Sequence, residues 1–299
     1  MTKLESATDT KRQVFLGTAN FTQSYGLSKV TSGLSEGVIH EILNQVEIDE
    51  EIHLDTAPQY GTSELLLGKL GKSRRFMQRI TTKIPHTEYG SSKAVIESVK
   101  NSLTQLKISS FENVRLHGIS EEMERNLGSI REGLNSILSL GLTRNVGLSC
   151  YTEADVTFAK EHLPIIKLFQ VPENVADSRL VDSEILRKLS QEGNRFLVRS
   201  VFLQGRLLQS STQLSSEFPE LLPIVTDLEL SAAERNLSKI EYCLAYVKSI
   251  PWASGIVVGV ETSKQLTQIL ASYRKIYPVI VFDNRKIDSP MVDPRNWKN

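Results

Sequence analysis

Short apolar runs alternate with longer amphipathic stretches along most of the chain. Eight runs have the length and composition of strands, at residues 14–17, 52–55, 80–83, 113–117, 144–149, 166–170, 195–200 and 255–259. Between them, apolar residues recur at helical spacing, as in Val95, Val99, Leu103 and Leu106. This alternation of strand and helix predicts a parallel sheet, because a helix is the usual crossover between parallel strands.

Local signals at the ends of the expected helices agree with this pattern. Ser120 precedes two glutamates, and Thr152 is followed three residues later by Asp155, so both residues are typical N-caps. Gly141 stands where a helix would end. The periodic positions from 123 to 137 predict one helix there.

Eight strands could form either an open doubly wound sheet or a closed barrel. An open dinucleotide-binding sheet would carry G-x-G-x-x-G after its first strand, and the chain has no such motif there. We therefore expect a (β/α)8 TIM barrel that takes in residues 1–299 as a single domain. Residues 203–224 make the loop after the seventh strand unusually long, and loops on that side of a barrel shape access to ligands.

Composition and charge limit the function. Lysine plus arginine equals aspartate plus glutamate at 35 each, which favours a small-molecule partner over nucleic acid or an anionic membrane. Cys150 and Cys243 have no CxxC spacing, so neither a disulfide framework nor a zinc site is indicated. The polar first 13 residues and the short apolar run after them predict no signal peptide or membrane span, and hence a cytoplasmic protein.

Four reactive side chains lie at or near the ends of neighbouring strands. Asp55 ends the second run, Lys83 the third and His117 the fourth, and Tyr60 follows Asp55 by five residues. In a barrel, the carboxyl ends of adjacent strands converge on one mouth. A buried lysine there needs a counter-charge, and a phenol beside a cation gives up its proton more readily.

The segment DTAPQYGTSELLLGKL, followed by ITTK and LHG, resembles the signature of the aldo-keto reductases, and the similarity extends over roughly residues 14–270. The resemblance implies metal-free, NAD(P)H-dependent reduction of a small carbonyl substrate to an alcohol. In that reaction Tyr60 would be the general acid, and Lys83, paired with Asp55, would make its phenol a stronger acid. His117 would donate a hydrogen bond to the carbonyl oxygen.

The resemblance also implies which residues hold the cofactor. Ser149 and Gln170 match positions that bind the nicotinamide carboxamide, whereas Cys150 stands where the family usually has asparagine and Arg199 where it often has a tyrosine. A guanidinium plane can stack on the nicotinamide too, but its charge would disfavour the oxidised ring. The full set is Gly17, Thr18, Asp55, Ser149, Cys150, Gln170, Arg199, Ser200, Phe202, Gln204, Gly205, Gly259, Thr262, Ser263, Lys264 and Gln265.

The choice between two nicotinamide cofactors depends on the segment GIVVGVETSKQL. Thr262 or Ser263 would cap a helix whose free N–H groups bind phosphate. The family often has an arginine near Gln265, and here Glu261 adds negative charge, so that Lys264 is the remaining cation nearby. We expect NADPH, with NADH as the alternative.

The first loop would form part of the substrate pocket through Asn20, Phe21 and Tyr25, although aromatic residues there fit a loop core equally well. This loop, the stretch VRSVFLQGRLL and the ending DPRNW are similar to a bacterial subgroup linked to polysaccharide or sugar metabolism, which favours an aldehyde, a ketone or a sugar-like substrate. An alternative function is a cofactor-binding barrel with a regulatory or redox-sensing role and little turnover. A metal-dependent sugar isomerase is a third reading, but the strand ends lack a cluster of carboxylates and histidines.

Overall fold

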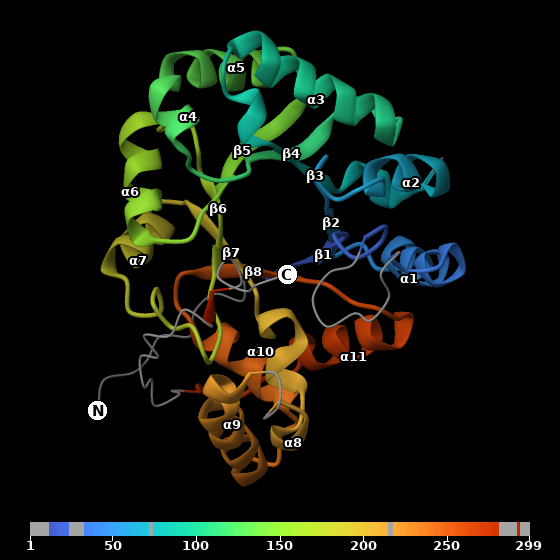
Figure 1. The fold of residues 1–299 in the computed structure, drawn as a ribbon, viewed down its shortest axis with the longest axis vertical. Helices are drawn as coiled ribbons and strands as arrows, with labels where there is room; N and C mark the ends of the chain where they lie inside the picture. The colour runs from blue at the N-terminus through green and yellow to red at the C-terminus, as the bar shows by residue number, and fades with distance from the viewer. Residues whose placement is uncertain (1–11, 24–32, 72–73, 215–217, 281–291, 294–299) are drawn as a thin grey trace.

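The computed structural model describes residues 12–23, 33–71, 74–214, 218–280 and 292–293. Parallel strands close into a barrel in chain order (Figure 1). They are β1 (Gln13–Gly17), β2 (Ile52–Asp55), β3 (Ile80–Ile84), β4 (Phe111–Leu116), β5 (Thr143–Ser149), β6 (Leu168–Pro172), β7 (Arg195–Arg199) and β8 (Ala253–Val258). The predicted (β/α)8 barrel is confirmed.

Helices surround the barrel and connect its strands. They are α1 (Glu36–Ile48), α2 (Ser63–Leu70), α3 (Ser92–Leu106), α4 (Glu121–Arg125), α5 (Leu127–Ser139), α6 (Glu153–His162), α7 (Glu184–Gln191), α8 (Ser211–Leu214), α9 (Leu222–Glu234), α10 (Lys239–Ser249) and α11 (Ser263–Arg274). Short 3-10 turns are η1 (Arg75–Gln78), η2 (His86–Glu88), η3 (Leu203–Leu208) and η4 (Pro219–Leu221). The expected N-caps at Ser120 and Thr152 are present, the second as a full capping box with Asp155.

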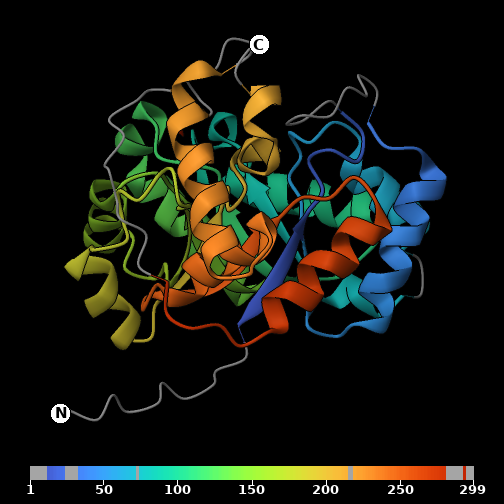
Figure 2. The same cartoon turned by 90° about the horizontal axis from the view of Figure 1, so that it is seen from below.

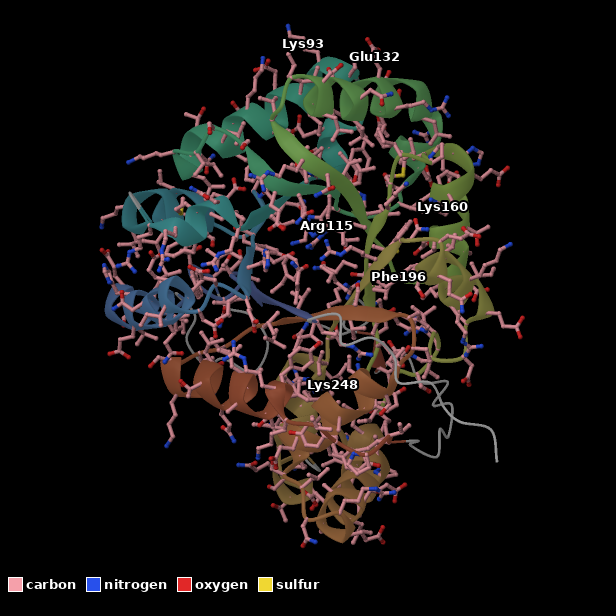
Figure 3. The ribbon with its side chains drawn as sticks, turned by 180° about the vertical axis from the view of Figure 1, so that it is seen from behind. Lys93, Arg115, Glu132, Lys160, Phe196 and Lys248 are labelled. Atoms are coloured by element: carbon pink, nitrogen blue, oxygen red, sulfur yellow. The ribbon has the colours of Figure 1, made fainter. Side chains whose placement is uncertain are left out.

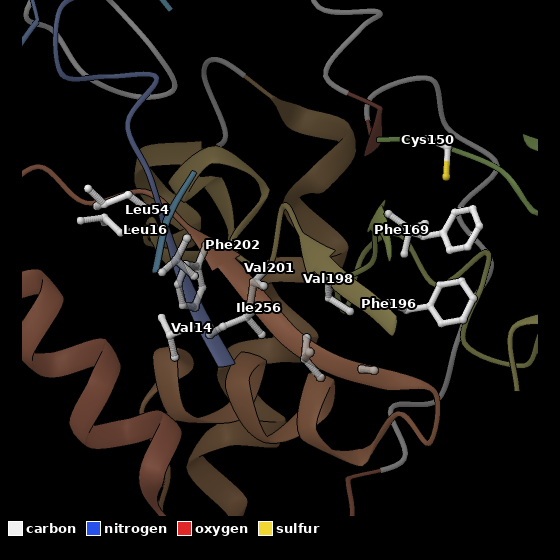
Figure 4. Packing of buried hydrophobic residues seen from close by; sticks show 14 of the residues in the cluster. Val14, Leu16, Leu54, Cys150, Phe169, Phe196, Val198, Val201, Phe202 and Ile256 are labelled. Carbon is white, nitrogen blue, oxygen red and sulfur yellow. The ribbon is translucent and has the colours of Figure 1, made fainter. Parts of the chain in front are cut away.

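Alternate strand residues face two different environments. Residues such as Val14, Leu16 and Leu54 point outward and join the large hydrophobic core between strands and helices (Figure 4). Phe15 points into the barrel, where it packs in a small cluster with Leu168 and Leu197. Most other inward positions are polar, so the barrel interior can carry chemistry as well as packing.

Several elements differ from the sequence prediction: β4 and β8 each begin two residues earlier than expected, and two other differences have a local cause. The helix expected over residues 123–137 is broken into α4 and α5, because the Asn126 side chain donates to the backbone carbonyl of Glu122, 2.9 Å away, and competes with helical hydrogen bonding. Strand β6 begins at Leu168, two residues later than expected, because Ile166 closes a turn onto the carbonyl of Leu163.

The long connection after β7 is not a plain loop. It contains η3, α8 and η4 and leads into α9 and α10, which lie side by side at one end of the molecule (Figures 1 and 2). Leu207, Leu214 and Leu221 bury their side chains in the main core. This burial fixes the connection against the barrel.

Candidate active site

The structure brings the four predicted catalytic side chains together at the carboxyl ends of β2, β3 and β4. Asp55 ends β2, Lys83 is the penultimate residue of β3, and His117 directly follows β4. The Tyr60 hydroxyl lies 3.0 Å from Lys83 Nζ, and the ring centroids of Tyr60 and His117 are 6.2 Å apart, edge to face. Asp55 and Lys83 are both 2% exposed, whereas Tyr60 is partly open to solvent.

Lys83 has one acceptor for each of its three ammonium protons. Nζ donates to Asp55 Oδ1, to the backbone carbonyl of Thr56 at 3.1 Å and to the Tyr60 hydroxyl at 3.0 Å. The Tyr60 oxygen is therefore an acceptor from the lysine. Its own proton remains free to be donated into the mouth of the barrel.

Asp55 accepts hydrogen bonds from two residues besides the predicted Lys83. Arg115 Nη1 donates to Asp55 Oδ2, and Gln170 Nε2 donates to the same oxygen at 3.1 Å. Burial alone would raise the pKa of Asp55, but the Lys83 and Arg115 cations outweigh burial and lower it to about 2. Asp55 is thus an anion at neutral pH.

His117 is held as a neutral imidazole. Burial lowers the pKa of His117 to about 3, and the nearby Lys83 cation acts in the same direction. Its backbone N–H donates to the hydroxyl of Tyr89, 2.8 Å away, which fixes the residue in place. His86 stacks on Tyr89 and lies 6.4 Å from His117, ring to ring. A neutral ring can donate one hydrogen bond to a carbonyl oxygen without carrying charge.

The loop that carries Tyr60 is tied to the loop after β1. Thr22 Oγ1 donates to the Tyr60 carbonyl at 3.0 Å and accepts from the Thr62 N–H at 3.0 Å. Gly61 lies between them at φ +57, where a Cβ would come within 2.8 Å of Thr22 Oγ1. Only glycine permits this close crossing without strain.

Two residues of this site escaped the sequence prediction. Arg115 lies inside the apolar run NVRLH, and an arginine at an inward position of a buried strand is a signal that could have revealed it. Tyr89 follows η2, and no local pattern connects it with His117. Both act on predicted residues, Arg115 on Asp55 and Tyr89 on His117.

At the expected nicotinamide end, the predicted residues contact one another. Ser149 Oγ donates to Gln170 Oε1 at 3.4 Å, and both residues are buried. Arg199 Nη2 donates to the Cys150 carbonyl at 3.3 Å, and its guanidinium lies 4.2 Å from the centroid of the Tyr151 ring. Burial raises the pKa of the Cys150 thiol well above its usual range, which keeps it protonated.

The backbone after β7 takes an uncommon conformation at three of the expected cofactor residues and at Leu203, which lies among them. Ser200, Leu203 and Gln204 have positive φ values of 62, 47 and 53, as does Gly205 at 89. Non-glycine residues adopt this region at a cost and are concentrated at functional sites. Phe202, by contrast, buries its ring in the main hydrophobic core (Figure 4).

The expected adenosine end is the N-terminus of α11. Thr262 is its N-cap and accepts from the Gln265 N–H at 3.2 Å, and the Gln265 side chain accepts from the Glu261 N–H at 2.7 Å. Ser263 Oγ donates to Glu41 of α1 at 3.2 Å. Gly259 and Lys264 are exposed beside this helix end. An exposed N-terminus of this kind fits the phosphate of a dinucleotide, although Glu41 adds negative charge there.

The first loop is more buried than a substrate pocket requires. Asn20 Nδ2 donates to the Val260 carbonyl at 2.7 Å, and Phe21 is 1% exposed within the main core. Tyr25 and the ending DPRNW lie outside the described residues, apart from Asp293. Gly17 ends β1, and Thr18 donates through Oγ1 to the Asp55 carbonyl at 3.3 Å. This loop therefore contacts the backbone of the candidate catalytic residue Asp55 through Thr18.

The described part of the chain lacks two features that would point to other functions. It holds no group of three or more histidine, cysteine, aspartate or glutamate side chains placed to bind a metal ion. Among the described helices, none combines the length and the apolar character needed to span a membrane.

Comparison with known proteins now defines the class. The model of the aldo/keto reductase family matches residues 13–279, which is most of the chain. The chain therefore belongs to the aldo/keto reductase family. It is an NAD(P)H-dependent oxidoreductase, and proteins of this family act on small-molecule carbonyl substrates. No curated protein matches it in sequence.

Solved structures agree on the fold. The chain is similar to aldo-keto reductase AKR11C1 from Bacillus halodurans (TM-score 0.71, 17% identity, covering 88% of this chain and 87% of that one). It is also similar to the thermostable aldo-keto reductase Tm1743 (TM-score 0.70, 20% identity, 89% and 90%). A third is the glycerol dehydrogenase AKR11B4 from Gluconobacter oxydans (TM-score 0.69, 18% identity, 88% and 86%).

Proposed function

We propose that this chain reduces the carbonyl group of an aldehyde, a ketone or a sugar-like molecule to an alcohol, with Tyr60 as the general acid. The observation that carries this proposal is the hydrogen bond from Lys83 Nζ to the Tyr60 hydroxyl, 3.0 Å long, which leaves the phenol proton free to be donated. We take residues 1–299 as the single domain that does this in the cytoplasm.

Each of the four residues has its own role in this reaction. Neutral His117 donates a hydrogen bond to the carbonyl oxygen and orients it, while Tyr60 delivers its proton to the same oxygen as negative charge develops there. Lys83 then stabilises the phenolate, and Asp55 holds Lys83 in place. When bound, the reduced nicotinamide supplies the hydride.

For the cofactor, we propose that Ser149, Gln170 and Arg199 surround the nicotinamide and that the N-terminus of α11 binds the adenosine phosphate. NADPH is the first candidate, as in the expectation from the sequence. Glu41 and Glu261 near that helix end would repel an additional phosphate, so they favour NADH as the alternative. Direct titration with each reduced cofactor, followed by fluorescence, decides between them.

One observation favours a second function, a cofactor-binding barrel with a regulatory or redox-sensing role. Arg199 is held against Tyr151 and the Cys150 carbonyl, at the place expected for the nicotinamide. A fixed guanidinium there would make the affinities for oxidised and reduced cofactor differ, which is a property that a redox sensor needs. Cofactor binding without turnover of any carbonyl in a broad panel would support this second function.

Tyr60→Phe tests the proposed role of the phenol. Since it removes the proton donor and little else, we expect kcat for carbonyl reduction to fall by about 10²–10⁴-fold while cofactor affinity stays within about twofold. The measurement is reduced-cofactor absorbance against aldehydes, ketones and keto-sugars. Tyr277→Phe is a matched control, because it removes a phenol that donates to the Ser272 carbonyl far from the barrel mouth. Unchanged kcat in Tyr60→Phe would rule out this role.

A further inference from the structure

A second cation lies inside the barrel, below the predicted catalytic residues. Arg115 on β4 is 0% exposed, and its guanidinium contacts Asp55 Oδ2 and lies 5.5 Å from the centroid of the Phe15 ring. Figure 3 places it near the middle of the ring of strands, whereas Lys93 and Glu132 lie on the outer helices. It touches a catalytic carboxylate without reaching the mouth.

Asp55 is thereby shared between two cations. Its Oδ1 accepts from Lys83 and its Oδ2 accepts from Arg115, so each positive charge has only part of one negative charge. With Asp55 ionised, the three buried groups together carry a net positive charge. Lys83 brings this charge within 3.0 Å of the Tyr60 oxygen.

Arg115 is poorly explained as a stabilising residue. Its Nε and Nη2 atoms are buried and have no hydrogen-bond partner among the described residues. A buried cation with unsatisfied donors costs stability, and an apolar side chain of similar volume is often as stable or more so. The chain retains an arginine where Asp55 already has Lys83 and Gln170 as donors.

We propose that Arg115 is a positioning residue that keeps the site around Tyr60 positively charged. By engaging one oxygen of Asp55, it orients the other toward Lys83 and leaves the ammonium charge incompletely neutralised. That charge stabilises the phenolate that remains after Tyr60 has given its proton to the substrate. The proposal rests on the proposed function, because it assumes that Tyr60 is the general acid.

The decisive experiment follows ionisation of Tyr60 without any substrate. Tyrosinate absorbs in the ultraviolet, and the chain has 8 tyrosines, so the signal of Tyr60 is the difference between a protein and its Tyr60→Phe counterpart. We expect the midpoint for Tyr60 to move to higher pH by about one unit in Arg115→Met, because a nearby positive charge is lost. Coincident midpoints in the two proteins would overturn the proposal.

Two further variants keep the result interpretable. Arg115→Gln removes the charge but retains a donor for Asp55 Oδ2, so it must show the same shift and serves if Arg115→Met does not fold. Arg79→Gln is the matched control, because Arg79 is a partly buried arginine before β3 that donates to the backbone carbonyls of Asp49 and Val46. Its midpoint should stay at the wild-type value. The ionisable groups that act on His117, namely Asp55, Lys83, His86 and Arg199, are unchanged in these variants, as is Arg195, whose charge acts on Arg115.

Activity then separates the two proposals. If the wild type reduces carbonyls, kcat should fall about tenfold in Arg115→Met, and the limb of the pH profile that declines toward alkaline pH should move upward with the Tyr60 midpoint. A fall in kcat at every pH with no shift of the limb indicates a merely structural arginine and overturns the inference. If no carbonyl is reduced by the wild type, the proposed function fails, while the Tyr60 titration still decides the charge effect.

Discussion

Two buried carboxylates in this barrel have opposite ionisation behaviour. Asp55 ends β2 and Glu173 directly follows β6, and neither is more than 2% exposed. Asp55 faces the cations of Lys83 and Arg115, and its pKa is lowered to about 2. Glu173 accepts from the Tyr246 hydroxyl at 2.9 Å and from the Leu180 N–H at 3.0 Å, and burial raises its pKa well above the usual range.

Between these two sites, the charge of the partners and not the depth of burial makes the difference. Burial acts to raise the pKa at both sites, and at Asp55 the two cations Lys83 and Arg115 outweigh it. Asp55 therefore contributes a charge to the mouth of the barrel. The pKa of Glu173 is raised instead, and its hydrogen bond with Tyr246 connects the segment after β6 to α10. Asp55 thus affects the charge of the site, whereas Glu173 holds two segments of the chain together.

The largest expected effect comes from removing the charge of Asp55. Asp55→Asn leaves Lys83 and Arg115 buried without a counter-charge, so the free energy of unfolding should fall by about 3–5 kcal/mol. Urea unfolding measures this loss. Asp182→Asn, at an exposed position, is the control and should change stability by less than about 0.5 kcal/mol. A loss below about 1 kcal/mol in Asp55→Asn would show that the two cations do not depend on Asp55.

A smaller effect on the free energy of unfolding is expected from protonating Asp55 with acid. The pKa of Asp55 is lowered on folding from 3.8 to about 2, so the carboxylate contributes stability above pH 3.8 that is lost as pH falls toward 2. At 1.36 kcal/mol per unit, the contribution is about 2 kcal/mol. Unfolding free energies from urea titrations between pH 5 and 2 should therefore decline less steeply in Asp55→Asn than in the wild type. Parallel declines would contradict the low pKa of Asp55.

The sequence alone was sufficient to predict the barrel and the catalytic candidates. Strand and helix periods are local, and residues at the ends of parallel strands must converge, so Asp55, Lys83 and His117 could be placed together without coordinates. Their contacts with Tyr60 agree with that placement. At the cofactor end, Cys150 and Arg199 depart from the family pattern, and the structure joins them through the hydrogen bond from Arg199 to the Cys150 carbonyl.

Other features depend on contacts that no local pattern encodes. Glu173 and Tyr246 meet across 73 residues of chain, and Arg115 and Asp55 across 60. The break between α4 and α5 arises from one side chain, Asn126, in an otherwise continuous helical period. The hydrophobic periodicity of an element predicts which of its faces is buried. It does not predict which distant polar group a side chain on that face will contact.

The smallest effect is expected at Glu173, where a neutral group should serve nearly as well. In Glu173→Gln the amide oxygen can accept from the Leu180 N–H and the amide nitrogen can donate to the Tyr246 hydroxyl, so the free energy of unfolding in acid should change by less than about 1 kcal/mol. Since the pKa of Glu173 is raised on folding, its contribution is present below pH 4.5 and is lost as pH rises through the folded value. The variant should lack this alkaline loss, so it should gain stability relative to the wild type as pH increases.

Urea unfolding between pH 4 and 9 tests both expectations. Glu173→Leu is the comparison, because it leaves both donors unpaired and should cost about 1–3 kcal/mol. If Glu173→Gln were as damaging as Asp55→Asn, then Glu173 would be a buried anion too, and the contrast between the two carboxylates would disappear.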